Sequence, residues 1–292
     1  QRIHRSKRTD HVSWMLLPPD QFLFRLVLPH ALLFAHKNTS CVTVTTARSL
    51  ASMPKRTLLQ RGSSCSDLFV YAHIEGSYIA PRVKAVTSDA FVTELHGAGT
   101  SAYRNLITGR GGWGSYVHEI AAEIGHPFRR TCLITWSAGS QVALEAAQSK
   151  DTPDAIVMLD GLYGSKPQPS KMGDGKVVWT AALEALAEYA LRAVRGEKRL
   201  VLFHSNIPTP YASSKECCEA IQAYVEKKCG PMQALDLPAP SLDGHACKEA
   251  WQLGHFYVVE FAGRDANEHI LEAHLWDQAC ELWIPWLTED VC

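Results

Sequence analysis

A serine between an apolar run and a helical pattern is the side chain with the clearest chemical role in this sequence. Ser137 follows the run 131–136 and precedes a helical pattern that begins near Gln141. A sharp turn from strand to helix raises a serine hydroxyl above the sheet edge, where it can attack a carbonyl carbon. Such a turn needs small residues two positions before and after the serine. Gly139 meets this condition, whereas Thr135 stands where glycine is usual. Ser137 is therefore a candidate nucleophile for acyl transfer.

A glycine-rich stretch upstream of the serine is a candidate source of backbone amides for a developing oxyanion. The strand-like run 90–95 ends in the sequence His-Gly-Ala-Gly at 96–99. Glycines in such a loop allow a backbone N–H to point at the oxygen that becomes negative in the transition state. We expect the amides of Ala98 and of Ala138, the residue after the nucleophile, to form the oxyanion hole.

A serine nucleophile also needs a base and a group that orients the base. Two histidines, His269 and His274, follow the last predicted strand. In a helix over about 270–284 the apolar residues form one stripe and His274 lies on the solvated face, so we favour His269, at the helix start, and keep His274 as the second candidate. Asp160, directly after the strand-like run 155–159, is the candidate acid; a turn or cap role is its alternative.

The sequences at 96–99 and 135–139 resemble the oxyanion motif and the nucleophile elbow of the α/β-hydrolase superfamily. The order nucleophile, acid, histidine is also the superfamily's. The resemblance covers roughly 67–292 and implies hydrolysis of an ester, or less often an amide, through an acyl-enzyme on Ser137. Superfamily enzymes usually carry the acid after the penultimate strand, here 199–203, which no Asp or Glu follows before Glu216. Some lipases take it one strand earlier, where Asp160 is similar in placement.

Several polar and aromatic residues are candidates for lining the site. The cluster His204, Ser205 and Asn206 follows the run 199–203, and Asn206 is a fallback for orienting the histidine. We assign substrate-lining roles to His96, Trp136, Tyr163 and His204. The stretches 100–117 and 161–178 are expected to form the lips of an open cleft suited to bulky or aromatic acyl groups. Their aromatic residues, for which ordinary packing is the alternative, are Tyr103, Trp113, Tyr116 and Tyr163.

The elements that must position these residues alternate between strand and helix. Alternation of this kind predicts an α/β fold, with a mostly parallel sheet covered by helices on both faces. A full α/β-hydrolase has a further strand between Gly99 and Thr131, where this sequence has room for one helix. The resemblance therefore implies a reduced α/β-hydrolase fold of about five to seven strands, with the oxyanion and nucleophile strands as neighbours. The predicted strands are 67–73, 90–95, 131–136, 155–159, 199–203 and 256–261, and the predicted helices are 113–124, 141–147, 177–195, 214–228 and 270–284.

Charge divides the chain into two predicted parts. Residues 1–66 hold ten Lys and Arg against two acids, whereas 67–292 hold nineteen against twenty-eight, although the whole chain has a net charge of only −1. We expect 1–66 to be a basic extension, either leader-like or poorly ordered, with a structural arm as the alternative, and 67–292 to be the catalytic domain. The acidic body argues against nucleic-acid binding. No apolar window is long enough for a transmembrane helix.

The cysteines and histidines do not indicate a cofactor. Nine cysteines cannot all pair internally, and no CxxC occurs. We therefore favour a reducing, cytoplasmic location; secretion, and one disulfide among Cys217, Cys229 and Cys247, are the alternatives. The thirteen histidines show no HxH or HExxH spacing, and no nucleotide-binding glycine motif follows a strand, so we expect neither metal nor cofactor.

The expected function is thus hydrolysis of a small-molecule or polymeric ester. Two alternatives remain: an amidase or peptidase with the same triad, and a hydrolase-like protein that has lost catalysis and binds a ligand. Thr135 at the elbow and the missing late acid motivate the second alternative. The sequence does not indicate an oligomeric state.

Overall fold

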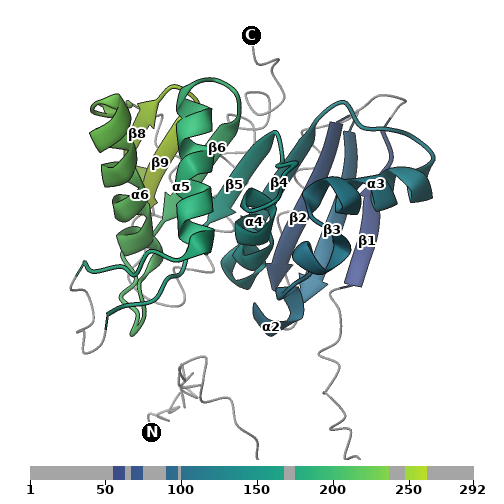
Figure 1. The fold of residues 1–292 in the computed structure, drawn as a ribbon, viewed down its shortest axis with the longest axis horizontal. Coiled ribbons are helices and arrows are strands. Elements are labelled where there is room, and N and C mark those ends of the chain that lie inside the picture. The colour runs from purple at the N-terminus through teal and green to yellow at the C-terminus, as the bar shows by residue number, and fades with distance from the viewer. Residues whose placement is uncertain are drawn as a thin grey trace, which may run out of the picture. The chain divides into compact units, whose positions relative to one another are not determined.

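A mostly parallel sheet organises the part of the chain that the structure, a computed structural model, describes (Figure 1). The described residues are 55–62, 67–74, 90–97, 100–167, 175–236 and 247–261, and all of them belong to one compact unit. Within them the sheet has nine strands. These are β1 (Lys55–Gln60), β2 (Asp67–Ile74), β3 (Ala90–Gly97), β4 (Thr131–Trp136), β5 (Ala155–Leu159), β6 (Arg199–His204), β7 (Gln233–Ala234), β8 (Cys247–Leu253) and β9 (Phe256–Phe261).

The strand order places the chemically interesting turns at one edge of the sheet. The order is β1-β3-β2-β4-β5-β6-β9-β8-β7, and the six strands from β3 to β9 run parallel to one another. Strand β1 is antiparallel to β3, while β8 and β7 close the other side as antiparallel strands. Because parallel strands share their carboxyl edge, Ser137 after β4, Asp160 after β5 and Ser205 after β6 lie along the same rim.

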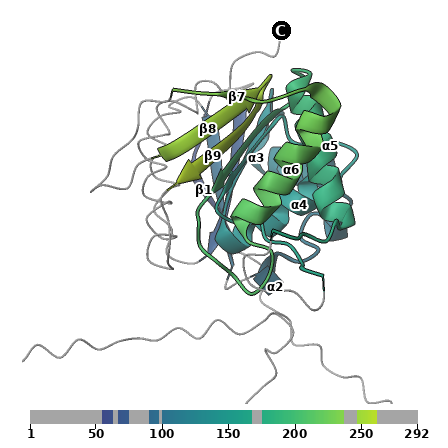
Figure 2. The ribbon, with the colours of Figure 1, turned by 90° about the vertical axis from the view of Figure 1, so that its left-hand side faces the viewer.

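Five helices lie in the described part of the chain, and all of them pack on the same face of the sheet. Their apolar side chains join one core cluster with alternate residues of the strands. Figure 2 shows α4, α5 and α6 side by side on this face. The other face is equally buried, through residues such as Phe69, Ile134 and Val157. The helices are α2 (Thr100–Tyr103), α3 (Trp113–Ile124), α4 (Ser140–Ala147), α5 (Ala181–Val194) and α6 (Ser214–Cys229).

The predicted α/β class is confirmed, and most predicted elements occur at the predicted residues. The sheet is mostly parallel, and strands β4, β5 and β9 match their predicted bounds. Helix α3 ends, as predicted, at Gly125, whose φ of 87° is the left-handed conformation that favours glycine. The helix predicted over 270–284 lies outside the described residues, so helices on the second face stay a prediction. None of the described helices could cross a membrane.

The expected size and neighbour relations of the sheet were wrong. The sheet exceeds the five to seven strands predicted, and β2 lies between β3, which carries the glycine-rich sequence, and the nucleophile strand β4. The expectation that β3 and β4 would be neighbours assumed that a strand had been lost. In fact β2 pairs with both β3 and β4 over most of its length, so no strand is missing on this side.

Strand β1 lies upstream of residue 67, where we expected the folded domain to begin. It pairs with β3 from Lys55 opposite His96 to Gln60 opposite Val92. The folded part therefore starts no later than Lys55, and the predicted boundary between residues 66 and 67 was placed too late. Residues 1–54 lie outside the described part, and the proposal that they form a leader-like extension is untouched by the structure.

The described cysteines are free thiols, which contradicts the alternative of a disulfide among Cys217, Cys229 and Cys247. Cys217 and its neighbour Cys218 are fully buried residues of α6 itself, whereas Cys229 is exposed at the end of this helix. Burial raises the pKa of the Cys217 thiol to about 12, so this sulfur is held as a neutral, unreactive group.

Candidate active site

Ser137 occupies a strained turn between β4 and α4. Its φ is +50°, a value that side chains other than glycine rarely adopt, while Trp136 before it is extended. The turn continues as a short 3-10 segment, Ser137–Gly139, into α4. Such strain costs on the order of 1–3 kcal/mol and persists where the surroundings impose it, most often at functional sites. The half-buried Ser137 hydroxyl thus stands at the carboxyl edge of the sheet, as the sequence predicts.

Two glycines allow the neighbouring strands to close around this turn. A Cβ atom at Gly139 would overlap the carbonyl oxygen of Ala72 in β2 and lie 2.8 Å from the amide nitrogen of His73. A Cβ atom at Gly161, after β5, would overlap the Ser140 hydroxyl and lie 2.5 Å from the Ser137 carbonyl oxygen. Both positions therefore require glycine. The sequence analysis identified Gly139 but missed Gly161, although an Asp-Gly pair directly after a strand is a signal for such a close approach.

Thr135, the departure from the usual elbow pattern, fits the site. Its side chain is fully buried, and its hydroxyl lies 3.3 Å from the Ser140 hydroxyl and 3.4 Å from the Val157 carbonyl oxygen. The threonine can donate to the carbonyl and accept from the serine, so its polar group is satisfied. A glycine here would leave the Ser140 hydroxyl without this partner. Thr135 therefore supports the turn between β4 and α4.

Asp160 is held beside the elbow by hydrogen bonds from Ser205, the residue directly after β6. Residues Trp136 and Leu159 are register partners at the ends of β4 and β5, so Ser137 and Asp160 directly follow a paired position. Asp160 is 2% exposed and has a φ of +39°. The Ser205 amide donates to its Oδ1 atom at 3.1 Å, and the Ser205 hydroxyl donates to its Oδ2 atom at 2.8 Å. Two donors to a buried carboxylate fix its position and compensate its desolvation.

Tyr163 completes the turn after β5. Its hydroxyl donates to the Asp160 carbonyl oxygen at 2.8 Å, and its ring contacts Tyr211 edge-on at 5.3 Å between centroids. The side chain is half-buried, which suits the predicted substrate-lining role. Gly164 pairs with Ala212 through two backbone hydrogen bonds, so the segment after β5 is attached to the segment after β6.

The polar cluster after β6 divides into groups with different partners. Ser205 binds Asp160, whereas the Asn206 amide donates to Glu260 at 2.5 Å and its oxygen accepts from Lys215 at 2.8 Å. The Asn206 side chain is thus directed toward the end of β9. Its fallback role in orienting a histidine stays a prediction, because His269 and His274 lie outside the described residues. His204, opposite Glu260 in the sheet register, is 2% exposed. Its Nδ1 atom has no hydrogen-bond partner among the described residues.

The buried His204 predicts a pH dependence of stability. Desolvation lowers the pKa of His204 below its usual 6.5, so below that value the unfolded chain binds a proton that the folded chain does not. Stability should therefore be retained above about pH 6.5 and fall as the pH drops from there toward the folded-state pKa. We expect the melting temperature to fall less in His204→Gln than in the wild type when the pH is lowered from about 7.5 to about 5.5. The exposed His118→Gln is the matched control; equal losses in all three proteins would contradict this account.

Several predicted lining residues lie in the core. Tyr103, Trp113 and Tyr116 are at most 2% exposed, so packing, rather than the edge of a cleft, explains these aromatic rings. Burial raises the pKa of Tyr116 to about 12, which keeps its hydroxyl neutral. Trp136 is 5% exposed and packs on the second face of the sheet, which does not favour contact with a substrate. Of the four aromatic residues expected at the lips of an open cleft, only Tyr163 is partly exposed; for Tyr103, Trp113 and Tyr116 the alternative, ordinary packing, is correct.

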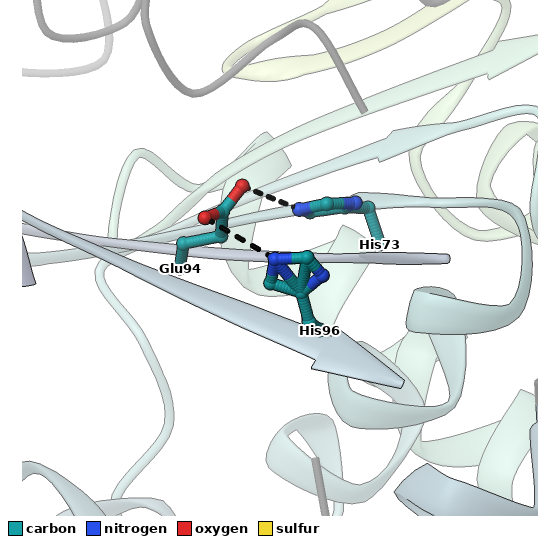
Figure 3. A group of neighbouring side chains, drawn as sticks. All are labelled: His73, Glu94 and His96. Atoms are coloured by element: carbon teal, nitrogen blue, oxygen red, sulfur yellow. Dashed lines mark hydrogen bonds and ion pairs between the residues drawn. The ribbon is translucent and has the colours of Figure 1, made fainter. Parts of the chain in front are cut away.

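His96 lies at the end of β3 with a different set of neighbours than predicted. Its imidazole faces Glu94 and His73, on the side of the sheet away from the described helices (Figure 3). A hydrogen bond from His73, opposed in part by burial, holds the pKa of the Glu94 carboxyl below its usual range. The neighbouring Tyr103 hydroxyl donates to the carbonyl oxygens of His73 and Leu95 and so connects the ends of β2 and β3.

The remaining predicted site residues are described only in part. Ala138 is buried directly after the nucleophile, at the start of the turn into α4. Ala98, His269 and His274 lie outside the described residues. Helix α2, which begins two residues after Ala98, contacts the 3-10 turn Ser137–Gly139. The chain after β3 thus returns to the elbow even though β2 separates the two strands.

The strand order, the parallel centre of the sheet and the serine elbow together define an α/β-hydrolase-like fold. No protein-family model and no curated protein sequence matches the chain. Structural neighbours at low identity are α/β-hydrolases. Acylaminoacyl peptidase from Pyrococcus horikoshii matches with a TM-score of 0.43 and 12% identity, over 81% of this chain and 41% of that chain. The poly(3-hydroxybutyrate) depolymerase LpqC from Bordetella parapertussis matches with a TM-score of 0.43 and 16% identity, over 78% of this chain and 84% of that chain. A lipase-esterase related protein from Clostridium acetobutylicum matches with a TM-score of 0.41 and 11% identity, over 81% of this chain and 100% of that chain.

Proposed function

We propose that this protein is a serine hydrolase that cleaves carboxylic esters through an acyl-enzyme on Ser137. The observation that carries the proposal is the strained φ of Ser137 at the β4–α4 turn, with a buried, hydrogen-bonded Asp160 at the end of the adjacent strand. A serine and a carboxylate at neighbouring strand ends are the two fixed members of a hydrolytic triad. The third member comes, in this proposal, from the segment after β9.

The proposed reaction begins with attack of the Ser137 hydroxyl on the ester carbonyl. His269 removes the serine proton and then gives it to the departing alcohol, while Asp160 orients the imidazole and stabilises its protonated form. The resulting acyl-enzyme is attacked by water, which His269 deprotonates in turn, and the acid is released. His274 is the alternative base.

The oxyanion of each tetrahedral intermediate needs two donors near Ser137. The amide of Ala138 is one, because it belongs to the residue directly after the nucleophile. The amide of Ala98 is the second in this proposal, and the contact of α2 with the elbow supports it. Because β2 lies between β3 and β4, the chain after β3 must pass the end of β2 for the Ala98 amide to reach Ser137 in this proposal.

Thr135 at the elbow and the lack of an acid after β6 were the two reasons for considering an inactive protein, and the described contacts weaken both. Thr135 takes part in the hydrogen bonds of the elbow. No carboxylate follows β6 directly, but Asp160 lies beside the elbow and is held there by hydrogen bonds from Ser205. These observations favour an active enzyme over a protein that only binds a ligand.

Paired chromogenic substrates test the reaction class. We expect the protein to release p-nitrophenol from p-nitrophenyl acetate and butyrate, and to leave the corresponding p-nitroanilides nearly uncleaved. The leaving groups are similar in shape, so the comparison isolates the bond that is broken. Anilide cleavage with a kcat/KM similar to that of the esters would instead assign an amidase or peptidase.

A further inference from the structure

Three side chains capable of binding a metal converge at the ends of β2 and β3. His73 on β2 is the register partner of His96 on β3, and Glu94 lies two residues before His96 on the same face. Side chains two apart on a strand share a face, and neighbouring strands are about 4.8 Å apart. The sheet itself therefore brings His73, Glu94 and His96 together, on the face opposite the described helices.

The contacts within this cluster are short and specific. The Nε2 atom of His73 lies 2.7 Å from Oε1 of Glu94, and the Nε2 atom of His96 lies 3.5 Å from Oε2 of the same carboxylate. Figure 3 shows the carboxylate directed at both rings, whose centroids are 4.8 Å apart. One ligand atom from each residue can be chosen so that all three lie within 4.8 Å of one another. The carboxylate thus faces two imidazoles that also face each other.

The surroundings fix the inner ligand and leave the outer one accessible. The His73 side chain is fully buried and its ring stacks on Tyr71 at 4.6 Å between centroids. The Tyr103 hydroxyl donates to the His73 carbonyl oxygen, so its backbone is held as well. The side chains of Glu94 and His96 are 13% and 32% exposed. The cluster therefore has a rigid inner wall and an opening to solvent.

We propose that His73, Glu94 and His96 form a binding site for a divalent transition-metal ion, with zinc as the ion that best fits the ligands. Two imidazoles and one carboxylate are a ligand set found in zinc sites that keep an open coordination position. Ligands about 2.0–2.1 Å from a tetrahedral zinc lie roughly 3.3 Å from one another. The distance of 2.7 Å from His73 to Oε1 of Glu94 and the distance of 3.5 Å from His96 to Oε2 lie on either side of this value. Ligand atoms of all three residues lie within 4.8 Å of one another, so side-chain movements would close the set around one ion.

The ion would connect the end of β2, the strand beside the elbow strand β4, to the end of β3. His73 follows Ala72, whose carbonyl oxygen contacts Gly139 in the nucleophile turn, and His96 precedes Gly97 at the end of β3. A bound ion would stabilise the folded chain, because a ligand that prefers the folded state raises the melting temperature. This site uses none of the residues in the proposed catalytic mechanism. The proposed metal site is therefore a second site on the protein, and its proposal does not depend on the proposed hydrolase activity.

Zinc titration of the full chain, freed of metal with a chelator, tests the site. By isothermal titration calorimetry we expect one equivalent of zinc to bind at this cluster, and cobalt in its place to give the visible absorption bands of a low-symmetry site. Glu94→Gln, which keeps the shape of the side chain, and His96→Ala should each weaken this binding at least 10-fold and remove the zinc-dependent rise in melting temperature. His118→Ala, which removes an exposed histidine elsewhere, should bind zinc as the wild type does.

Three outcomes would overturn the site: no zinc binding by the folded wild type, equal binding by all three variants, or a loss that His118→Ala shares. Circular dichroism of each variant separates loss of a ligand from loss of the fold. If both cluster variants fail to fold, proton NMR of the cobalt-loaded wild type decides, because absence of the paramagnetically shifted N–H signals of bound imidazoles excludes the site. Labelling of Ser137 by a fluorophosphonate reports the proposed hydrolase separately, so the two proposals can fail independently.

Discussion

Ser137→Ala is expected to lower kcat for p-nitrophenyl butyrate by on the order of 10³-fold or more, with KM little changed. The substitution removes only a hydroxyl that stands at the carboxyl edge of the sheet, in a turn whose φ of +50° is imposed by its neighbours. Because the hydroxyl forms the covalent bond to the acyl group, no other described group can take over its role at the same position. Steady-state kinetics with purified protein gives both constants.

A matched serine separates this effect from a general loss of structure. Ser115 on α3 is exposed, and Ser115→Ala should keep wild-type kinetics. Circular dichroism and the melting temperature of Ser137→Ala should remain near those of the wild type, since a half-buried hydroxyl is removed and no cavity of consequence forms. If Ser137→Ala retained more than about a tenth of the wild-type kcat, Ser137 would not be the nucleophile.

Asp160→Asn is expected to reduce kcat by on the order of 10³-fold or more, through loss of the charge that orients and stabilises the histidine. The substitution also changes a buried contact, because the amide group of Asn places a donor near the Ser205 amide and hydroxyl. A moderate loss of melting temperature should accompany the kinetic effect. Ser205→Ala removes the hydroxyl donor and keeps the carboxylate, so it should cost far less activity. Equal kinetic losses in the two variants would contradict the assignment of Asp160.

The histidine partner is decided by two further variants in the same assay. His269→Ala should match Ser137→Ala in its loss of kcat, because triad members act as a unit. His274→Ala should retain most of the activity, since the sequence pattern places it on the solvated face of the predicted helix. Loss in His274→Ala with retention in His269→Ala would reverse the assignment of the base.

Local patterns sufficed for the elements that carry the elbow. The apolar run 131–136, the Ser-Ala-Gly turn and the small residues of α4 lie next to one another in sequence, so their structure follows from neighbours. The same holds for the strand before Asp160. Strand order is different, because it depends on which distant segments pair. The interposition of β2 between β3 and β4 could not be inferred from the interval between Gly99 and Thr131.

The sequence prediction also failed at the edge strands β1 and β8, neither of which was predicted. Strands β1 and β8 carry charged residues such as Arg56 and Lys248, which blunted the alternation that reveals a strand. Arg56 forms an ion pair with Glu123 of α3, so part of the basic N-terminal segment complements the acidic body. The sequence does divide into a basic and an acidic part, but this division does not mark the start of the folded domain.

The His73, Glu94 and His96 cluster shows why a motif search missed a candidate metal site. Sequence spacings such as HxH or HExxH describe ligands on one element. Here the ligands are divided between two strands, and only the register of β2 against β3 brings them together. The available signal was Glu94-Leu-His96, two ligand types at the spacing of one strand face, beside a strand that ends in another histidine.

Covalent labelling of the full chain with a fluorophosphonate, followed by peptide mass spectrometry, tests the central claim most directly. An activated serine reacts with this reagent, whereas ordinary surface serines do not. The account predicts about one equivalent of label on the peptide that contains Ser137, and no label in Ser137→Ala. Absence of labelling in the folded wild type, or labelling that persists in Ser137→Ala, would contradict it.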